Sequence, residues 1–363
     1  MTQHESVRFK IMRNGAEYAE IFPDGSAPTL KGSTSGEIKT SLKGTFMAAA
    51  KNASGRTVEV DWLSDEIKPV LLRGGIEYPL GVLIPTTIST DRSAHKETVS
   101  LAAYDRCWRV KDTRKETLAH IAQGTLYLTA IESLLTDAGI SAILSTSTNL
   151  ALTEDREDWD LAESNLKIAN QLLGEINYNQ VWFNSDGAAV LEPASTPSTE
   201  NIEHVFTSRK TDPRNQREIE IISILPELSR QTDFYSTPNV FLCICSNPDK
   251  SGAMVATAEN NNPQSPLSIP RRGRRIVKVA RVNNIASQAE LQNYADRMAS
   301  DSLLTGETIS VSTALQPGFG IGDIVAIDYG DIVSVCVEKS WTMELKPGGK
   351  MKHELERVVL NFG

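Results

Sequence analysis

The sequence predicts an α+β protein that is mainly β, in which two β-rich segments flank one α-rich segment. Alternating apolar and polar residues predominate at both ends of the chain, and helical periodicity is concentrated between them. The length of 363 residues is sufficient for two or three domains. We therefore expect a β domain over residues 1–110, a small α+β domain over 111–195, and a second β domain over 196–363 with one helix at about 287–304.

Period-two patterns predict strands in the first segment. Residues 57–62 and 98–103 alternate apolar with polar side chains. Glycine-containing turns at 23–25 and 73–75 separate such runs, and strands at this spacing are typical of a barrel or sandwich. The stretch 30–50 is rich in glycine, serine and threonine, so we expect a loop there.

Capping signals and apolar spacing predict three helices in the second segment. Thr113 and Glu116 have the spacing of a capping box, which places a helix start at Thr113. A second helix covers the apolar positions within 128–135 and ends at Gly139, because glycine suits the left-handed residue that follows many helices. A third helix begins near Asp160, three residues before a glutamate.

A hairpin, a linker and further strands follow these helices. The run 181–191 predicts a hairpin with its turn at 184–187. Residues 193–199 have the proline, serine and threonine content of a linker. The chain then returns to β structure at 217–225 and 240–245.

The last ninety residues predict a self-contained β unit with one helix. A basic alternating strand at 274–282 precedes a helix that Ser287 and Glu290 mark as a capping box. A long hairpin over 335–362 ends the chain. Its alternation predicts one face made of Val337, Trp341, Met343 and Leu345, and an opposite face made of Glu338, Ser340, Thr342 and Glu344.

Composition excludes several classes of protein. The net charge is −9, and an acidic surface disfavours general DNA binding. Aromatic residues are only 6%, too few for a platform that stacks single-stranded bases. The four cysteines are scattered, which predicts buried thiols in a reducing compartment. No apolar run has the length of a membrane helix and no signal peptide is visible, so we expect synthesis in a cytoplasm.

The glycine run at 318–322 has a superficial likeness to a dinucleotide-binding fingerprint. That motif requires a strand before it and a helix after it, so that the helix N-terminus meets the pyrophosphate. Here a strand, residues 324–327, follows the glycines. We therefore interpret the run as a tight turn between strands.

The acidic run at 154–160 lacks the glycine and the closing glutamate of a calcium loop. Carboxylates before a helix are expected from the helix dipole. We interpret the run as a solvated, helix-initiating segment, with an opportunistic divalent ion as the alternative.

No sequence-local catalytic or metal motif is present. The five histidines are dispersed, and His120 lies among apolar positions as a packed residue would. The run 32–36 has threonine where a nucleophile elbow needs serine. Paired carboxylates of a glycosidase stay open, because their pairing is spatial. We expect no catalytic residue, no metal site and no cofactor.

One basic patch stands out near residue 275. It is either a docking surface for an acidic partner, a grip on nucleic acid, or a set of cations paired with acidic neighbours in the same particle or chain. Its members are Arg271, Arg272, Arg274, Arg275, Lys278 and Arg281.

The order of these motifs resembles that of the hub or tail-tip (minor tail) proteins of long-tailed bacteriophages. The resemblance covers roughly residues 110–363, and loose motifs in a fixed order carry it. They lie at residues 124–140, 166–187, 238–266 and 272–323.

The resemblance implies two β domains like those of the tail tube. In that family three chains form a pseudo-six-fold ring that adapts the six-fold tube to a three-fold tip, so it implies a homotrimer in a virion tail, assembled in the bacterial host cytoplasm. The implied partners are the tail tube or distal tail protein and a central spike or tip protein, with DNA passing without specific binding. The particle is either a phage or a phage-derived contractile injection system.

The resemblance also bears on activity. Many relatives continue into a peptidase or sugar-cleaving module, whereas this chain stops at Gly363, so we expect a structural protein and no enzyme. We further expect a lumen lined by carboxylates, from the acidic balance.

Two alternatives to a structural hub stay open. The first is a phage cell-wall hydrolase that degrades peptidoglycan. The second is a tail component that binds a receptor or carbohydrate, which exposed tryptophans would favour. The tryptophans mostly lie on apolar faces, so we expect them in the core; they are Trp62, Trp108, Trp159, Trp182 and Trp341.

Overall fold

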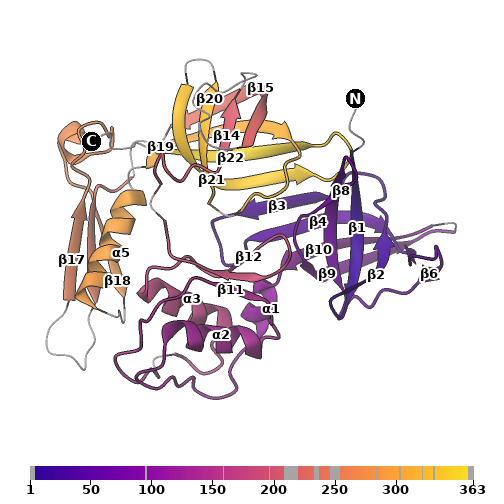
Figure 1. Ribbon diagram of the computed structural model, residues 1–363, viewed down its shortest axis with the longest axis horizontal. Helices are drawn as coiled ribbons and strands as arrows, with labels where there is room; N and C mark the ends of the chain where they lie inside the picture. The colour runs from indigo at the N-terminus through magenta and orange to yellow at the C-terminus, as the bar shows by residue number, and fades with distance from the viewer. Residues whose placement is uncertain are drawn as a thin grey trace.

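The computed structural model describes residues 5–94, 96–157, 159–195, 197–207, 220–232, 237–245, 254–282, 285, 287–301, 304–320, 322–329 and 332–358. Strands predominate and the helices are few, which confirms the predicted α+β, mainly β class. Figure 1 shows two β units side by side, a helical unit below them, and a small separate sheet with its own helix on the left.

The N-terminal β unit is a strongly curved sheet. Its ends meet where Met47 N–H donates to Phe22 O and Asp24 N–H donates to Thr45 O, each at 2.8 Å. The strands are β1 (Glu5–Arg13), β2 (Ala16–Ile21), β3 (Thr29–Ser33), β4 (Thr40–Met47), β5 (Ala50–Lys51), β6 (Thr57–Val58), β7 (Glu66–Arg73), β8 (Ile76–Pro79), β9 (Leu83–Arg92) and β10 (Glu97–Asp105).

The loop expected over residues 30–50 is wrong, because most of this stretch forms β3 and β4. Leu30 pairs with Leu42 across the two strands, and both are fully buried with Phe46. The small polar residues between them face outward, so an overall loop-like composition conceals a period-two pattern. The strand expected at 57–62 is likewise only Thr57–Val58.

The helical unit packs α2 and α3 against a short three-stranded sheet, around one core. The predicted second helix and the hairpin are confirmed, and Gly139 and Gly187 adopt positive φ angles of 77° and 81°. The elements are α1 (Cys107–Asp112), α2 (Tyr127–Asp137), β11 (Ile143–Ser145), α3 (Asn165–Glu175), β12 (Trp182–Phe183) and β13 (Ala189–Leu191).

Two helix starts in this unit were predicted wrongly. Thr113 ends α1 instead of starting a helix, because its N–H and its Oγ1 both bond to Arg109 O, at 3.0 and 2.9 Å. The third helix begins at Asn165, not near Asp160, because Ser164 is its N-cap: the Ser164 hydroxyl accepts from Lys167 N–H at 3.2 Å.

The C-terminal barrel contains six strands, and the pairing of β20 with β21 closes it. The prediction of a glycine turn at 318–322 is confirmed in the described residues, since this run links two strands and Gly318 has a φ of 88°. The strands are β14 (His204–Thr207), β15 (Glu220–Thr232), β19 (Leu304–Ala314), β20 (Ile324–Tyr329), β21 (Ile332–Glu344) and β22 (Lys350–Val358). Residues 217–219, predicted as strand, lie outside the described residues.

The alternation predicted for the terminal hairpin is correct only after residue 340. A register shift between Glu338 and Ser340 adds one residue to β21. Side chains before the shift therefore point to the opposite face from the one that the alternation predicts. As a result Glu338 is 1% exposed and lies in the barrel core, whereas the pattern placed it on the solvent face. Trp341 and Met343 are buried as expected.

A fourth unit, here named the α5 unit, is inserted between β15 and β19. Helix α5 covers one face of the three-stranded sheet β17-β16-β18, with its own core. The predicted cap is confirmed, since Glu290 N–H donates to Ser287 Oγ at 3.1 Å. Its elements are β16 (Val240–Cys245), β17 (Met254–Glu259), α4 (Ile269–Arg272), β18 (Val277–Val282) and α5 (Gln288–Asp301). The three predicted domain ranges stay a prediction.

Candidate functional site

The two β units repeat one strand arrangement. When four strands of each unit are numbered in chain order, they lie side by side in the order first, second, fourth, third. This order is β3-β4-β10-β9 in the N-terminal unit and β15-β19-β22-β21 in the C-terminal barrel. In each set an earlier strand also pairs with the third one: β7 with β9 at Ile67 and Leu83, and β20 with β21. One chain therefore carries two versions of the same four-stranded sheet.

The two sheets are joined edge to edge. Strand β21, third in the C-terminal set, pairs antiparallel with β3, first in the N-terminal set. Trp341 lies against Gly32 at this joint, where a Cβ on the glycine would come within 2.3 Å of the indole ring. The joint makes one eight-stranded sheet, in the order β15-β19-β22-β21-β3-β4-β10-β9.

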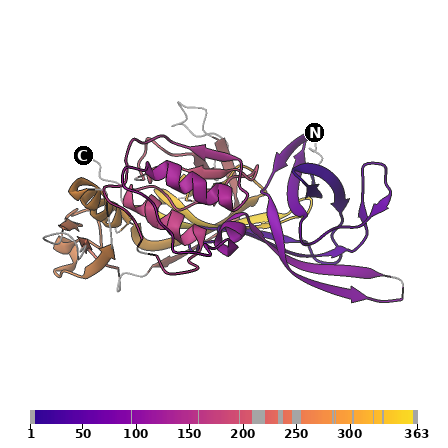
Figure 2. The same ribbon diagram turned by 90° about the horizontal axis from the view of Figure 1, so that it is seen from below.

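Both outer edges of this eight-stranded sheet are open within the described residues. Beyond Leu83, which pairs with Ile67, β9 bonds only to β10. Figure 2 shows the long hairpin of β9 and β10 extending past the rest of its unit. At the other end β15 pairs with β14 only through Ser223, and from Glu227 to Thr232 its outer edge pairs with no described residue.

One face of the eight-stranded sheet packs on the two cores, and the other, here named the outward face, packs on neither of them. Register places hydroxyl side chains such as Ser100, Ser310 and Thr342 on the outward face. Its charges nearly balance: Lys31, Lys43, Lys339, Lys350 and Lys352 against Asp91, Glu344, Glu354 and Glu356. Carboxylates do not predominate on this face; the expected carboxylate-lined lumen stays a prediction.

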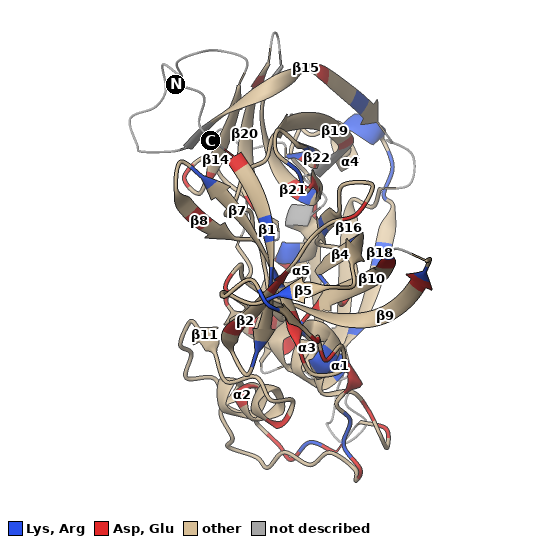
Figure 3. Cartoon of the chain, turned by 90° about the vertical axis from the view of Figure 1, so that its right-hand side faces the viewer, with Lys and Arg blue, Asp and Glu red and all other residues tan. Residues whose placement is uncertain are grey.

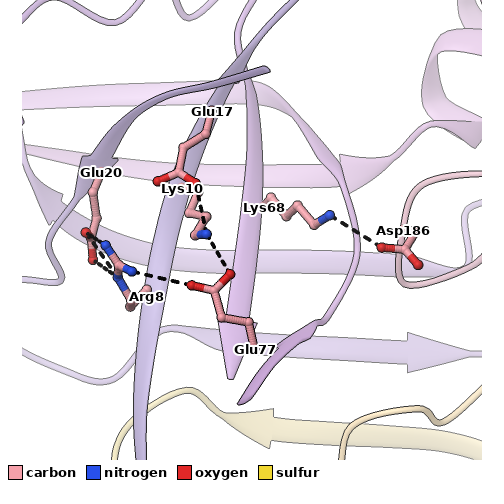
Figure 4. A network of polar contacts seen from close by, with 7 residues as sticks. All are labelled: Arg8, Lys10, Glu17, Glu20, Lys68, Glu77 and Asp186. Atoms are coloured by element: carbon pink, nitrogen blue, oxygen red, sulfur yellow. Dashed lines mark hydrogen bonds and ion pairs between the residues drawn. The ribbon is translucent and has the colours of Figure 1, made fainter. Parts of the chain in front are cut away.

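Charges elsewhere on the described surface are also interspersed, as Figure 3 shows. On β1, Arg8 bonds to Glu20 at 2.7 Å, while Lys10 bonds to Glu17 and Glu77 at 2.9 and 2.8 Å (Figure 4). Each such half-exposed pair contributes little to the stability of the fold. The network nevertheless pairs these basic and acidic side chains with one another within the chain.

The basic patch is divided between α4, the loop after it, and β18. Arg275 forms an ion pair with Glu259, which agrees with the alternative that the cations pair with acidic neighbours in the same chain. Arg272 donates to Thr237 O on the preceding segment. Arg271, Lys278 and Arg281 are exposed and have no ion pair with any described residue. Whether they dock a partner stays a prediction.

A buried titratable cluster in the C-terminal barrel was missed by the sequence analysis. His353 is 0% exposed, and its Nδ1 lies 2.5 Å from Glu338 Oε1. Burial raises the pKa of Glu338 well above its usual value and lowers the pKa of His353 to about 3, so both groups are neutral. The Glu338 carboxyl then donates to Nδ1, and Nε2–H donates to Thr313 Oγ1 at 3.0 Å.

Two further carboxyls have raised pKa values. Burial raises the pKa of Asp105 to about 6, although its carboxylate accepts the N–H groups of Lys39, Thr40 and Cys107. Burial, with repulsion from a nearby aspartate, raises the pKa of Glu203 to about 7. Asp105 links β4 to the start of α1, so its role is positional.

The acidic run at 154–160 does not start a helix. Its basic member, Arg156, is 2% exposed and donates to both carboxylate oxygens of Glu175 on α3, at 2.9 and 2.8 Å. The hydroxyl of Tyr127 donates to the same carboxylate at 2.9 Å. The run therefore anchors its loop to the helical core. Asp158 lies outside the described residues.

The sequence suggested that His120 is a packed residue, and this is wrong. Its side chain is 51% exposed and its Nδ1 lies 2.8 Å from Glu157 Oε1. Among the described residues no group of three or more histidine, cysteine or carboxylate side chains has the geometry to hold a metal ion. The four cysteines are buried, and none of them is in a disulfide. Each helix in the described part of the chain is too short or too polar to span a membrane.

A groove of about 560 Å³ separates α3 from the α5 unit. Arg281 and Arg297 line one wall, and the other wall includes Glu175, whose carboxylate Arg156 already occupies. A hydrogen bond from Asn177 Nδ2 to Glu290 Oε2, at 2.6 Å, joins the two walls. The lining brings no nucleophile together with a base.

Comparison with solved structures identifies the fold. The chain is similar to a tail protein from Neisseria meningitidis, with a TM-score of 0.65, 14% identity, and 97% and 96% of the two chains covered. It is also similar to a tail protein of prophage MuSo2 from Shewanella oneidensis, with a TM-score of 0.63, 9% identity and 98% of each chain covered.

A third similar structure is the prophage tail protein gp18 from Listeria monocytogenes, with a TM-score of 0.55, 12% identity, and 96% and 94% of the two chains covered. No protein-family model matches the sequence, and no curated protein matches it. At such low identity the likeness shows the fold alone, and it confirms the tail-protein fold that the sequence resemblance implied.

Proposed function

We propose that this chain, which has the fold of prophage tail proteins, is a structural hub of a phage tail tip or baseplate. The observation that carries the proposal is the duplication: one chain presents two four-stranded sheets of the same order, joined edge to edge. Three copies in a ring would then present six such sheets. A six-fold tube could stack on that ring while a three-fold tip attaches below it.

The internal joint suggests how neighbouring copies meet. Inside the chain, the third strand of one set pairs with the first strand of the other. The strands left over at the outer edges are β9, again a third strand, and β15, again a first strand. We propose that β9 of one copy pairs with β15 of the next, which closes the ring and removes both edges.

The outward face suits the lumen of such a ring. Its opposite charges nearly balance, and hydroxyls fill much of the space between them, as the pairing of Thr45 with Ser100 at 2.8 Å illustrates. A nearly neutral polar wall offers phosphates no array of cations to bind. In this proposal DNA passes without specific contacts, and no carboxylate lining is needed.

The proposed location is the tail of a virion or of a related contractile device. The proposed partners are two further copies of the chain, a tail tube or distal tail protein on one side, and a central spike or tip protein on the other. The proposed role is structural, without catalysis, because the Glu338–His353 pair is enclosed in the barrel core, where no substrate reaches it.

Native mass spectrometry and electron microscopy test the ring directly. We expect a species of three chains, and a ring with a central opening in images of the purified protein or of intact tails. A chain that stays monomeric at every concentration, and that is absent from tails, would contradict the hub.

Lysine pairs placed on the two edges test the proposed junction. S89K/D91K on β9 together with S229K/Q231K on β15 should abolish the trimer, because like charges meet across every junction. S89K/D91K with S229E/Q231E should restore it. The measurement is the oligomer distribution by native mass spectrometry.

T45K/T342K is the matched control, since it adds two lysines to the outward face on β4 and β21, neither of which lies next to an edge strand. A trimer that survives lysines on both edges would exclude the β9–β15 junction, but it would not exclude the ring itself.

Incubation with purified peptidoglycan tests the remaining alternative, a cell-wall hydrolase. We expect no clearance. Clearance that a single Glu or Asp substitution removes would replace the structural proposal by an enzymatic one.

A further inference from the structure

The sheet of the α5 unit has one covered edge and one open edge. Its central strand is β16, with β17 and β18 on either side. Helix α5 lies along the β17 edge, where Gln288 Nε2 donates to Val255 O at 3.0 Å and Gln292 Nε2 donates to Thr257 O at 3.3 Å. These glutamines occupy backbone acceptors that an added strand would need.

The β18 edge has no such cover within the described residues. Ile276 O accepts from Asn239 and Val240 N–H, so the peptide groups of residue 276 point toward β16. In a parallel ladder, alternate residues bond to the same side. The N–H and C=O groups of Val277, Val279 and Arg281 therefore point outward, and they form an unpaired ladder.

Apolar side chains accompany this open ladder. Val277 and Val279 are 53% and 46% exposed on the face away from α5, and Val255 of β17 is 49% exposed on the same face. Proteins rarely leave a valine-rich open edge unless another chain covers it.

Charge indicates what kind of chain covers the edge. Lys278 and Arg281 lie on β18 and Arg271 lies on α4, all exposed and without an ion pair to any described residue. The nearby carboxylate of Glu259 is already engaged by Arg275. The edge is therefore basic, and lysine on an edge strand disfavours pairing with a second identical edge.

We propose that the β18 edge binds an extended acidic segment of another tail protein, which adds to the sheet as a fourth strand. The backbone of that segment pairs with the outward peptide groups of Val277 and Val279. Its apolar side chains pack on the valines. Carboxylates on its opposite face meet Lys278, and a carboxylate beyond the valines on the apolar face meets Arg281. This surface is separate from β9 and β15, so it is independent of the proposed ring. Figure 1 shows β18 and β9 on opposite sides of the molecule.

Fluorescence anisotropy with a labelled peptide of alternating glutamate and valine tests this proposal on the full chain. We expect binding that weakens as salt is added, and a drop of at least about tenfold in affinity for K278E/R281E. V279P should abolish binding, because it removes an outward N–H while no bond to β16 is lost. Circular dichroism and the thermal midpoint verify that each variant is folded.

The matched control is K51E/R56E, which reverses two exposed cations at the far end of the N-terminal β unit and should leave the affinity unchanged. The proposal is overturned if the peptide fails to bind at millimolar concentration, if K278E/R281E binds it as well as the parent, or if an alternating lysine and valine peptide binds equally. Self-association of the chain that K278E/R281E removes would assign the edge to a second copy instead. Displacement of the peptide by single-stranded DNA would assign it to nucleic acid.

Discussion

At the scale of single residues, Glu338 and His353 form a titratable pair that is enclosed in the core of the C-terminal barrel. Both side chains are inaccessible, and each is held neutral by burial. Glu338 reaches the core only because the strand gains a residue just after it. A neutral hydrogen-bonded pair avoids the large desolvation cost of two buried charges.

The pH dependence of stability should report this pair. A folded-state pKa of Glu338 above its unfolded value gives stability that is complete below about pH 4.5 and is lost as pH rises. Glu338→Gln cannot ionise and can still donate to Nδ1. We expect the unfolding free energy of E338Q, relative to the parent, to increase from pH 4 to pH 8 in urea titrations.

Glu338→Ala provides the contrast. It leaves Nδ1 of His353 without its donor, at a cost of about 1–3 kcal/mol. In all these variants the depressed pKa of His353 makes stability fall as pH drops below about 6.5. A pH profile of E338Q parallel to that of the parent would contradict the neutral pair.

At the scale of elements, the loop before α3 shows how one residue can anchor a long irregular segment. Arg156 carries its guanidinium into the helical core, where it meets Glu175 and stacks over the ring of Trp159 at 4.8 Å. The surrounding acidic residues are mostly solvated. The anchor is therefore a single buried ion pair, not the carboxylate run that dominates the sequence.

Removing one partner of that ion pair should be costly. Arg156→Ala leaves the Glu175 carboxylate buried without its counter-charge, so we expect a loss of about 3–5 kcal/mol in unfolding free energy. The double variant R156L/E175L should recover much of this loss, since no charge is then left in the core. If R156A unfolds at the same denaturant concentration as the parent, the anchor is unimportant.

The joint between the two β units should be sensitive to one methyl group. Gly32→Ala places a Cβ against the Trp341 indole, so β3 and β21 must separate, and we expect a loss of about 1–3 kcal/mol. Gly174→Ala in α3 is the matched control: no atom lies within 4 Å of its added Cβ, and alanine favours the helix by about 0.5–1 kcal/mol. Thermal unfolding of the two variants should shift in opposite directions.

At the scale of the whole molecule, the duplicated sheets account for the proposed ring more directly than the net charge does. The charge of −9 belongs to the entire surface, whereas the outward face of the joined sheets carries similar numbers of basic and acidic residues. Net charge is a sum over all faces, so it cannot predict the charge of one face.

The ring proposal has a consequence for ionic strength. Because the outward face is nearly neutral and the β9–β15 junction is a backbone ladder, trimer formation should change by less than about threefold between 50 and 500 mM salt. Sedimentation at the two salt concentrations measures this directly. Dissociation at high salt would place the interface on charged side chains instead.

Particular elements show how far the sequence could be read. The helix capped by Ser287 and the hairpin at 181–191 were predicted because their signals are local: a hydroxyl on a nearby N–H and a glycine with positive φ. Thr113 was misread because a threonine at a helix end can satisfy a carbonyl as readily as an N–H. Local spacing does not distinguish the two.

The sequence by itself determined the class of the protein, the resemblance to tail proteins, and most helices and strands, since periodicity and caps act over a few residues. Only the tertiary structure decided the placement of Glu338, the joint of β21 with β3, and the open edges at β9, β15 and β18 in the described part of the chain. Those features depend on register and on pairings between residues hundreds of positions apart. A one-residue shift in register exchanges the buried and exposed faces without changing a single amino acid.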